Sequence, residues 1–238
     1  MSEENAVEAT HLTRVFGNFT AVDQVSFNIP RGEIFGLLGP NGAGKTTTIR
    51  MLCGILAPSF GAARVMGFDV SKQPEDVKQR IGYMSQKFSL YNDLTVNENL
   101  DFYANLYGVP REKVKPRLAE LIEMAGLLGH EKQSAGSLSG AWRQRLALAC
   151  AIVHEPPMLF LDEPTAGVDP VSRREFWEMI YRLAGQGVSV LATTHYMDEA
   201  EFCNVIGMMY HACLIALDDP DSLKEEMDGV LLEVDCDA

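Results

Sequence analysis

The stretch Gly39-Pro40-Asn41-Gly42-Ala43-Gly44-Lys45-Thr46-Thr47 decides the fold of this chain. It fits the pattern G-x-x-x-x-G-K-[ST], with Gly39, Gly44, Lys45 and Thr46 at the specified positions. Glycine lets the backbone turn tightly and approach a ligand closely. Successive N–H groups in such a loop, together with the N-terminus of the next helix, attract a phosphate. We therefore predict a nucleotide phosphate site, in which Lys45 reaches the β- and γ-phosphates and the Thr46 hydroxyl holds Mg²⁺.

The segments that flank this phosphate loop (residues 39–47) have the patterns of a strand and a helix. Residues 33–38 form a short apolar run, which is typical of a buried strand. Residues 47–53 are predicted to be helical. A glycine-rich turn before an ordinary helix is the alternative interpretation, but the motif requires a strand–loop–helix context and finds it here.

Length and composition are those of a globular protein. The chain has 238 residues, enough for one large domain or two small lobes, and 47% of them are apolar. No apolar run approaches the roughly 18 residues of a membrane span, and the acidic residues 1–4 are unlike a signal peptide. We therefore expect a soluble chain that can still dock on a membrane protein. The formal net charge of −13 argues against a nucleic-acid partner, because such a protein needs a basic patch to replace phosphate counterions.

The cysteines indicate a reducing environment. None of the five forms a C-x-x-C pair, so we expect reduced and mostly buried thiols in a cytosolic chain. They are Cys53, Cys150, Cys203, Cys213 and Cys236. His211 and Cys213 are close in sequence, but two further ligands at metal spacing are missing, so we do not expect a zinc site.

The first third of the chain is predicted to be rich in strands. Residues 7–12 favour a strand and residues 13–18 a loop. Residues 21–29 alternate apolar and polar side chains, which is typical of a half-exposed antiparallel strand. Further strands are predicted over residues 33–38, 63–66 and 81–85, with a short helix over residues 74–80.

Residues 87–155 are predicted to form a helical insertion. Its helices cover residues 97–107, 111–125 and 141–153. Beyond it we predict strands over residues 158–161, 188–192, 205–210 and 214–217, and helices over residues 171–184 and 220–227. We expect a single domain over residues 1–238, with a core from residues 1–86 and 156–238 and a helical subdomain from residues 87–155.

Three polar residues fall just after predicted strands: Gln86, Asp162 and His195. Strands that alternate with helices imply a largely parallel sheet, and such sheets bind ligands at the carboxyl ends of their strands. We therefore expect these three residues to lie with the phosphate loop at one edge of the sheet.

The motif Leu159-Phe160-Leu161-Asp162-Glu163 supplies two acidic residues at that edge. An apolar strand would carry Asp162 to the metal ion, and Glu163 would act as a general base that polarises water for attack on the γ-phosphate. The alternative is an acidic pair in an ordinary turn, which the presence of the phosphate loop in the same chain makes less attractive.

Taken in order, these motifs resemble those of the ATP-binding cassette (ABC) ATPases, the motor subunits of membrane transporters. The motifs are Phe16, Gly39–Thr47, Gln86, Leu138-Ser139-Gly140, Asp162-Glu163, Ala166-Gly167-Val168-Asp169 and His195. The resemblance covers essentially the whole chain. It implies an α/β fold, with a P-loop NTPase (RecA-like) core, an antiparallel β subdomain and an inserted α-helical subdomain. It also implies ATP and Mg²⁺ as ligands and ATP hydrolysis as the activity.

The resemblance assigns roles to the matching residues. Phe16 would stack on adenine, although a core aromatic is the alternative. Gln86 would contact Mg²⁺ or the attacking water, and His195 would hydrogen-bond the γ-phosphate unless it is merely structural. Asp169 would lie at a dimer seam near the catalytic water. The catalytic candidates are thus Lys45, Gln86, Glu163 and His195, the metal candidates are Thr46, Gln86 and Asp162, and the nucleotide-binding candidates are Phe16, Gly39, Pro40, Asn41, Gly42, Ala43, Gly44, Lys45, Thr46, Thr47, Ser139, Gly140 and Asp169.

One motif departs from the family pattern Leu-Ser-Gly-Gly-Gln. Here the sequence is Leu138-Ser139-Gly140-Ala141-Trp142. In the family this segment offers a helix N-terminus to the ATP of a second subunit, so the resemblance implies a head-to-tail dimer around two ATP molecules. Ser139 and Gly140 keep the core of that contact. Ala141 adds a Cβ where glycine permits close approach or a positive φ, and Trp142 replaces an amide with an aromatic ring. Both changes weaken the prediction that this segment contacts the ATP of a second subunit.

The expected partners are a second cassette and a separate membrane permease, at the cytoplasmic face of the cell membrane. The helical insertion is the surface that the family uses for its permease. A docking patch is predicted from residues that follow Gln86, with internal packing as the alternative. Its members are Phe88, Leu90, Tyr91, Leu94 and Val96.

Within the family, residues 167–177 and 193–201 and the Trp142 variant are similar to bacterial drug-resistance-type exporter ATPases, which commonly continue beyond this chain's end. Residues 230–238 would be a stub of such an extension or a natural end. Two other functions stay open: a soluble cassette that acts on the ribosome or nucleic acid, disfavoured by the acidity, and a regulatory cassette that holds ATP without hydrolysing it.

Overall fold

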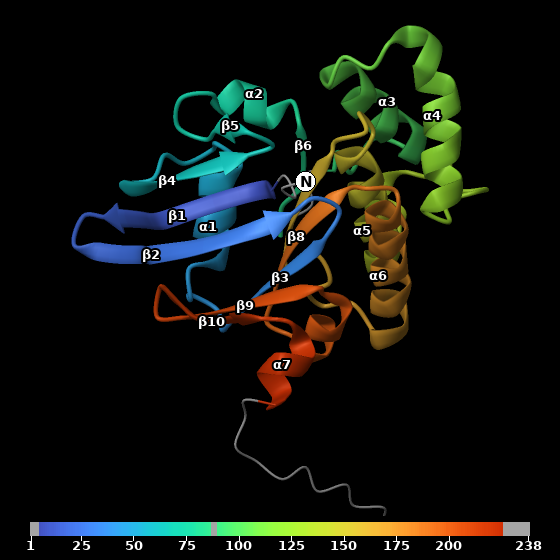
Figure 1. The fold of residues 1–238 in the computed structure, drawn as a ribbon. Helices are drawn as coiled ribbons and strands as arrows, with labels where there is room; N and C mark the ends of the chain where they lie inside the picture. Colours follow the sequence, from blue (N-terminus) through green and yellow to red (C-terminus); the bar gives the residue numbers. More distant parts are fainter. Residues whose placement is uncertain (1–4, 87–89, 226–238) are drawn as a thin grey trace, which may run out of the picture.

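The computed structural model describes residues 5–86 and 90–225, and Figure 1 shows the fold that they form. Two sheets organise it. One has four strands in the order β2-β1-β4-β5, and the other has six in the order β10-β9-β3-β8-β7-β6. The predicted stub over residues 230–238 and Phe88, a predicted member of the docking patch, lie outside the described residues.

The four-stranded sheet is antiparallel and is built on a long hairpin. Its strands are β1 (Asn5–Phe16), β2 (Phe19–Pro30), β4 (Phe60–Val65) and β5 (Phe68–Asp69). The predicted loop over residues 13–18 is wrong, because β1 continues to Phe16 and pairs there with Phe19. Register shifts between Ala9 and Arg14 interrupt the apolar–polar alternation, so the pattern stops before the strand does.

The six-stranded sheet contains the predicted parallel core. Its strands are β3 (Ile34–Leu38), β6 (Ile81–Met84), β7 (Met158–Asp162), β8 (Ser189–Thr194), β9 (Val205–Tyr210) and β10 (Cys213–Asp218). All pair in parallel except β10, which returns antiparallel to β9. Every residue of β3, β7 and β8 is buried, as expected for strands covered on both faces.

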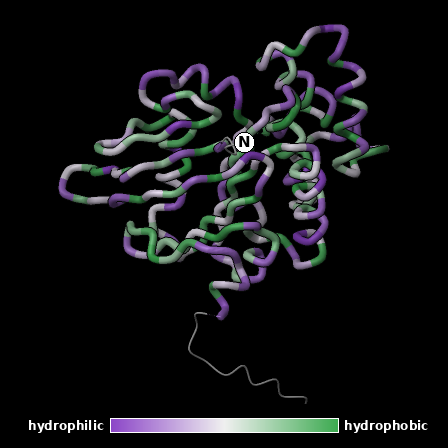
Figure 2. Tube along the Cα trace, viewed as in Figure 1, coloured by the Kyte–Doolittle hydropathy of each residue, from purple (hydrophilic) through white to green (hydrophobic). Residues whose placement is uncertain are grey.

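The two faces of this sheet bury different cores. In β7, Met158 and Phe160 point into the core shared with the antiparallel sheet and α1 (Lys45–Leu52), while Leu159 and Leu161 point into the opposite core. That opposite core includes α5 (Gly140–Ala151) and α6 (Pro170–Gly185), which lie together in Figure 1. Figure 2 shows hydrophobic residues along the central strands and hydrophilic ones on the outer loops.

The helical region follows the prediction closely. Its longer helices are α3 (Val96–Leu106), α4 (Arg111–Met124) and α5, with a 3₁₀ turn over Ala135–Ser137. Thr95 begins α3 with a capping box, in which its side chain accepts from the Glu98 N–H and the Glu98 carboxylate accepts from the Thr95 N–H. The remaining elements are α2 (Pro74–Lys78), a 3₁₀ segment (Met197–Phe202) and α7 (Pro220–Glu225).

None of the helices among the described residues has the length and apolar character needed to cross a bilayer. Cys53, Cys150 and Cys203 are buried free thiols and Cys213 is a half-buried one, whereas Cys236 lies outside the described residues. Burial raises the pKa of Cys203 to about 12, so this thiol stays protonated at neutral pH.

Candidate nucleotide site

The phosphate loop joins β3 to α1 and depends on its glycines in two different ways. A Cβ on Gly39 would lie 2.2 Å from the Met209 carbonyl oxygen, and one on Gly44 would lie 2.5 Å from that of Ala21. A Cβ on Gly42 would meet nothing within 4 Å, yet its φ of +83° favours glycine. Neighbouring backbone therefore requires glycine at Gly39 and Gly44, while Gly42 is surrounded by open space and favours glycine through its φ.

A hollow of about 350 Å³ opens over this loop. It is lined by Phe19, Ala21, Asn41, Gly42, Gly44, Lys45, Thr46, Thr47, Gln86 and Glu163. The structure thus brings Gln86 and Glu163, both from other elements, to the phosphate loop as the sequence predicts.

Lys45 is the first residue of α1, and its ammonium lies inside the loop with only 4% of the residue exposed. Its Nζ donates to the carbonyl oxygens of Gly39 at 2.7 Å and Pro40 at 3.1 Å. The same Nζ lies 3.4 Å from Oε1 of Glu163. The loop therefore holds a positive charge directly beside the predicted general base.

Asp162 ends β7 and is fixed by two hydroxyls. Thr46 Oγ1 and Thr193 Oγ1 each donate to Asp162 Oδ1 at 2.9 Å. Burial raises the pKa of Asp162, and these two hydrogen bonds oppose that effect. Thr193 was not predicted, and the signal that could have found it is a hydroxyl near the end of β8, the strand beside β7.

The oxygen atoms at this point fit Mg²⁺. A carboxylate and a threonine hydroxyl within hydrogen-bond distance are hard oxygen ligands of the kind that Mg²⁺ takes. A divalent cation would also offset the cost of burying an ionised Asp162. Thr46 and Asp162 are therefore the residues that would hold the ion.

Glu163 is the point at which the catalytic candidates meet. Gln86 Nε2 donates to Glu163 Oε2 at 3.0 Å, and His195 Nδ1 lies 3.6 Å from the same oxygen. Lys45 faces the other oxygen. The backbone of Glu163 has φ +48° and its N–H donates to the hydroxyl of Thr193 at 2.9 Å. A left-handed backbone at a residue other than glycine is strained, and such strain is often found at functional sites.

The β1–β2 hairpin presents two exposed aromatic rings, Phe16 and Phe19, of which Phe19 lines the hollow. Phe16 is 45% exposed, so it is not the core aromatic that was the alternative, and the Arg14 guanidinium lies 4.5 Å from its ring centroid. Phe19, opposite Phe16 in the hairpin register, is 63% exposed and lines the hollow. The sequence prediction missed Phe19, although an aromatic residue directly across a two-residue turn from Phe16 shares its face of the hairpin.

Comparison with known proteins decides the family. The sequence model described as ABC transporter matches residues 22–166, which is more than half of the chain. The chain belongs to the ABC transporter family. A shorter match, over residues 142–197, is to an AAA domain described as a putative AbiEii toxin of a type IV TA system.

Curated ABC relatives include the probable multidrug ABC transporter ATP-binding protein YbhF of Escherichia coli (strain K12). It is 49% identical over 94% of this chain, which spans 39% of the length of YbhF. The daunorubicin/doxorubicin resistance ATP-binding protein DrrA of Streptomyces peucetius is 40% identical over 96% of this chain and 70% of its own length. The linearmycin resistance ATP-binding protein LnrL of Bacillus subtilis (strain 168) is 38% identical over 94% of this chain and 72% of its own length.

Solved ABC structures share the fold. The cassette cbiO1 from Clostridium perfringens, part of the ABC transporter complex cbiONQ, has a TM-score of 0.86 at 26% identity, over 94% of this chain and 92% of its own. The cassette MJ0796, described as a dimeric post-hydrolysis state bound to ADP and Pi, has a TM-score of 0.80 at 24% identity, over 90% of this chain and 98% of its own. The predicted P-loop NTPase fold is confirmed.

Several ABC motif residues do not line the hollow: Phe16, Asp162 and His195 are absent from its lining, and so are Ser139, Gly140 and Asp169. Ser139 begins α5, where its Oγ accepts from the Trp142 N–H at 3.3 Å, and the adjoining Gly140 is exposed. Asp169 begins α6 and accepts from the Ser172 N–H at 3.0 Å, which is the main cause of its lowered pKa. The roles of Ser139, Gly140 and Asp169 at a second cassette stay predictions.

The ABC signature segment tolerates its unusual residues for local reasons. Ala141 lies inside α5 and does not adopt a positive φ, so this position does not require glycine for its backbone. Trp142 is half-buried, and its ring centroid lies 3.9 Å from that of His130. The larger side chain therefore packs inside the helical region, and the expected conflict at Ala141 over backbone conformation is not found.

The predicted docking patch is only partly a surface. Val96 is fully buried in the core, so its assignment to the patch is wrong, while Leu90 and Leu94 are half-buried. Tyr91 is exposed and makes an edge contact with Phe102 at 4.7 Å between ring centroids. Phe102, Leu106 and Tyr107 of α3 and the turn after it are further exposed large side chains that the prediction missed.

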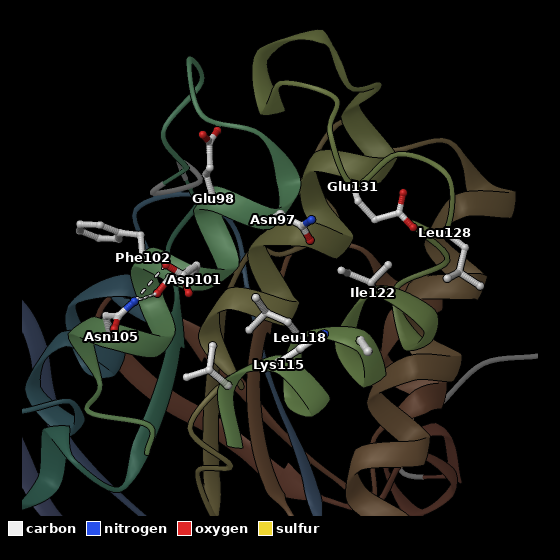
Figure 3. A pocket seen from close by; sticks show the side chains of 12 residues that line it. Asn97, Glu98, Asp101, Phe102, Asn105, Lys115, Leu118, Ile122, Leu128 and Glu131 are labelled. Carbon is white, nitrogen blue, oxygen red and sulfur yellow. Dashed lines mark hydrogen bonds between the residues drawn. The ribbon is translucent and has the colours of Figure 1, made fainter. Parts of the chain in front are cut away.

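A second hollow, of about 820 Å³, lies between α3 and α4 and holds none of the predicted site residues. Figure 3 shows Leu118 and Ile122 of α4 on its floor, with Glu98, Asp101 and Glu131 around it. It belongs to the helical region and is separate from the nucleotide hollow.

Proposed function

We propose that this chain is the ATP-hydrolysing subunit of a membrane exporter. The observation that carries the proposal is the meeting of Lys45, Gln86 and His195 on the carboxylate of Glu163, directly above the phosphate loop. A cassette that only held ATP would not need this arrangement around a base, so the geometry favours hydrolysis over a regulatory role.

The residues divide the reaction among them. Lys45 would neutralise charge on the β- and γ-phosphates, and the open side of Gly42 would admit them. Glu163 would take a proton from the water that attacks the γ-phosphate. Gln86 and His195, both at the same carboxylate oxygen, would orient that water and the γ-phosphate. Mg²⁺, held by Thr46 and Asp162 with Gln86 beside them, would supply charge neutralisation on the phosphates.

A second cassette would complete each site. Ser139, Gly140 and Asp169 are exposed and do not line the hollow over their own phosphate loop, which is compatible with contact to a partner's ATP. Two identical chains related head to tail would place these residues over both nucleotides with twofold symmetry.

The names of the relatives support a transport role. YbhF, DrrA and LnrL have names that refer to multidrug transport or resistance to particular drugs. We propose export of a drug-like compound through a separate permease, which would contact the helical region near Tyr91 and Phe102 at the cytoplasmic face of the membrane. The acidity of the chain disfavours action on nucleic acid.

Mg²⁺-dependent phosphate release by the purified chain tests hydrolysis. Glu163→Gln should lower kcat by about 100-fold or more while ATP still binds. Glu178→Gln, an exposed glutamate on α6, is the matched control and should behave as wild type. ATP should convert the Glu163→Gln chain from monomer to dimer in light scattering. Normal turnover in Glu163→Gln would contradict the assignment of the base.

Export is tested separately in cells. If a permease gene lies beside the gene for this chain, co-expression of the two should raise resistance to the transported compound, and Glu163→Gln should remove that gain. Resistance that persists in the variant would contradict the coupling of hydrolysis to export.

A further inference from the structure

Arg173, in the first turn of α6, joins two segments that leave the sheet separately. Its Nη1 donates to Asp198 Oδ2 at 2.9 Å, and its Nε lies 3.5 Å from Glu199 Oε1. Its Nη2 donates to the Val168 carbonyl oxygen at 3.4 Å. Its guanidinium lies 3.9 Å from the ring centroid of Tyr196. The Arg173 side chain is only 11% exposed, so its contact with the buried Glu199 is sheltered from solvent, whereas Asp198 is 65% exposed.

Glu199 makes this arrangement more than a surface ion pair. Its side chain is fully buried, and its Oε1 accepts a hydrogen bond from the Thr165 hydroxyl. A buried carboxylate is costly unless a cation or hydrogen bonds compensate it. Within residues 5–86 and 90–225, Arg173 is the cation at ion-pair distance from Glu199. Removal of Arg173 would therefore leave a buried charge that only Thr165 partners.

The two joined segments carry the catalytic candidates. Residues 163–169 follow β7 and contain Glu163, Thr165 and Asp169, while residues 195–199 follow the neighbouring strand β8 and contain His195. Arg173 contacts the first segment at Val168, and the second at Tyr196, whose ring lies 4.2 Å from that of His195. No hydrogen bond of Arg173 reaches the nucleotide hollow in the described part of the chain.

We propose that Arg173 is a positioning residue that holds these two segments in one arrangement, so that Glu163 and His195 keep facing each other. This inference rests on the proposed ATP hydrolysis for its catalytic consequence. The planar guanidinium suits the task, because it stacks on an aromatic face and donates in several directions at once. A lysine offers a compact charge that cannot do both.

Steady-state kinetics and hydrogen exchange test the proposal. Arg173→Met should lower kcat by about 10-fold or more, because small displacements of catalytic groups are costly, and leave KM for ATP within about twofold. Backbone exchange should rise in both residues 164–169 and residues 195–202. Arg173→Lys should give an intermediate kcat. Arg174→Met, an exposed neighbour on the same helix turn, should match wild type in every measurement.

A second variant covers the case in which Arg173→Met does not fold. Tyr196→Leu removes only the ring under the guanidinium, and it should lower kcat and raise exchange in residues 164–169, on the other side of Arg173. The proposal is overturned if exchange in either variant rises in one segment only, or if kcat falls equally in Arg174→Met. Absence of ATP hydrolysis in the wild-type chain would overturn the proposed function instead, and the exchange data would still decide the role of Arg173.

Discussion

Gln86 donates from Nε2 to Oε2 of Glu163 at 3.0 Å, although the two residues lie 77 positions apart in the chain. Gln86 comes two residues after β6 and Glu163 directly after β7, and these strands are parallel neighbours. The contact therefore links the predicted general base to the segment that leads into the helical region. Movement of that region is expected to alter the orientation of the Glu163 carboxylate.

The Gln86 contact predicts a loss of turnover without a comparable loss of binding. Gln86→Ala should lower kcat by about 10-fold or more, because Glu163 loses the donor that orients it, while KM for ATP changes little. Gln86→Glu should be worse, since a second carboxylate would repel the first. Phosphate release measures both. Gln79→Ala, at an exposed position after α2, is the control, and equal activity of Gln86→Ala and wild type would refute the assignment.

The aromatic pair at the hairpin tip predicts that two rings bind the nucleobase. Phe16→Ala and Phe19→Ala should each weaken ATP binding by about 1–3 kcal/mol, the usual worth of stacking a base on an aromatic ring. Binding of inorganic triphosphate, which has no base, should stay unchanged. Calorimetric titration provides both measurements, and Phe60→Ala, an exposed residue on β4, is the control. If Phe19→Ala binds ATP as wild type does, Phe16 acts alone.

Packing of Trp142 on His130 predicts a structural cost for restoring the usual family residue. Trp142→Gln should lower the free energy of unfolding by about 1–3 kcal/mol, since it removes the ring contact and part of the buried area. Trp142→Phe should lose less, because it keeps an aromatic ring. Denaturant unfolding measures the difference. Ala141→Gly, which adds flexibility but removes no packing of the ring, separates the two positions of the motif.

Burial of His154 predicts a pH dependence of stability. Burial lowers the pKa of His154, while the contact of its Nε2 with the Ile81 carbonyl oxygen at 3.1 Å opposes this. A lowered pKa in the folded state means that the stabilisation is present above the unfolded pKa of about 6.5 and is lost as pH falls. His154→Phe keeps the stack on Tyr107 but has no group that takes up a proton. Its free energy of unfolding should therefore fall less than that of wild type between about pH 7 and 5.

Unfolding midpoints at the two pH values provide the test. His211→Asn, at an exposed histidine, should leave the pH dependence of the wild type unchanged. An equal pH dependence in His154→Phe and wild type would show that other groups cause it.

Local sequence patterns predicted most of the helices and strands, because the spacing of apolar residues within each segment is typical of the element that it forms. The phosphate loop, β7 and β8 were predicted because short apolar runs end in polar residues at one sheet edge. The loop predicted over residues 13–18 failed because bulges in β1 break the alternation on which the prediction depends. The prediction for Val96 was wrong for a different reason. An apolar residue after Gln86 is equally compatible with a partner surface and with the core, and the structure buries Val96 in the core.

The predicted site residues were recognised by type and order, but their contacts depend on tertiary structure. Phe19 and Thr193 reach the site through strand pairing, which the sequence does not display. Arg173 was noted only as part of a family-like stretch, because its partners Glu199 and Tyr196 lie on a different segment. The Trp142 variant was read as a conflict because its partner His130 is twelve positions earlier and belongs to no motif.

The left-handed backbone of Glu163 places conformational strain at the predicted catalytic base. An L-residue in that conformation costs about 1–2 kcal/mol, which glycine would not incur. Glu163→Gly would relieve that strain, but it would also remove the base and leave the buried Lys45 ammonium without its carboxylate neighbour. Laboratory evolution for heat resistance that also demands ATP turnover should therefore keep this glutamate and gain stability at other positions.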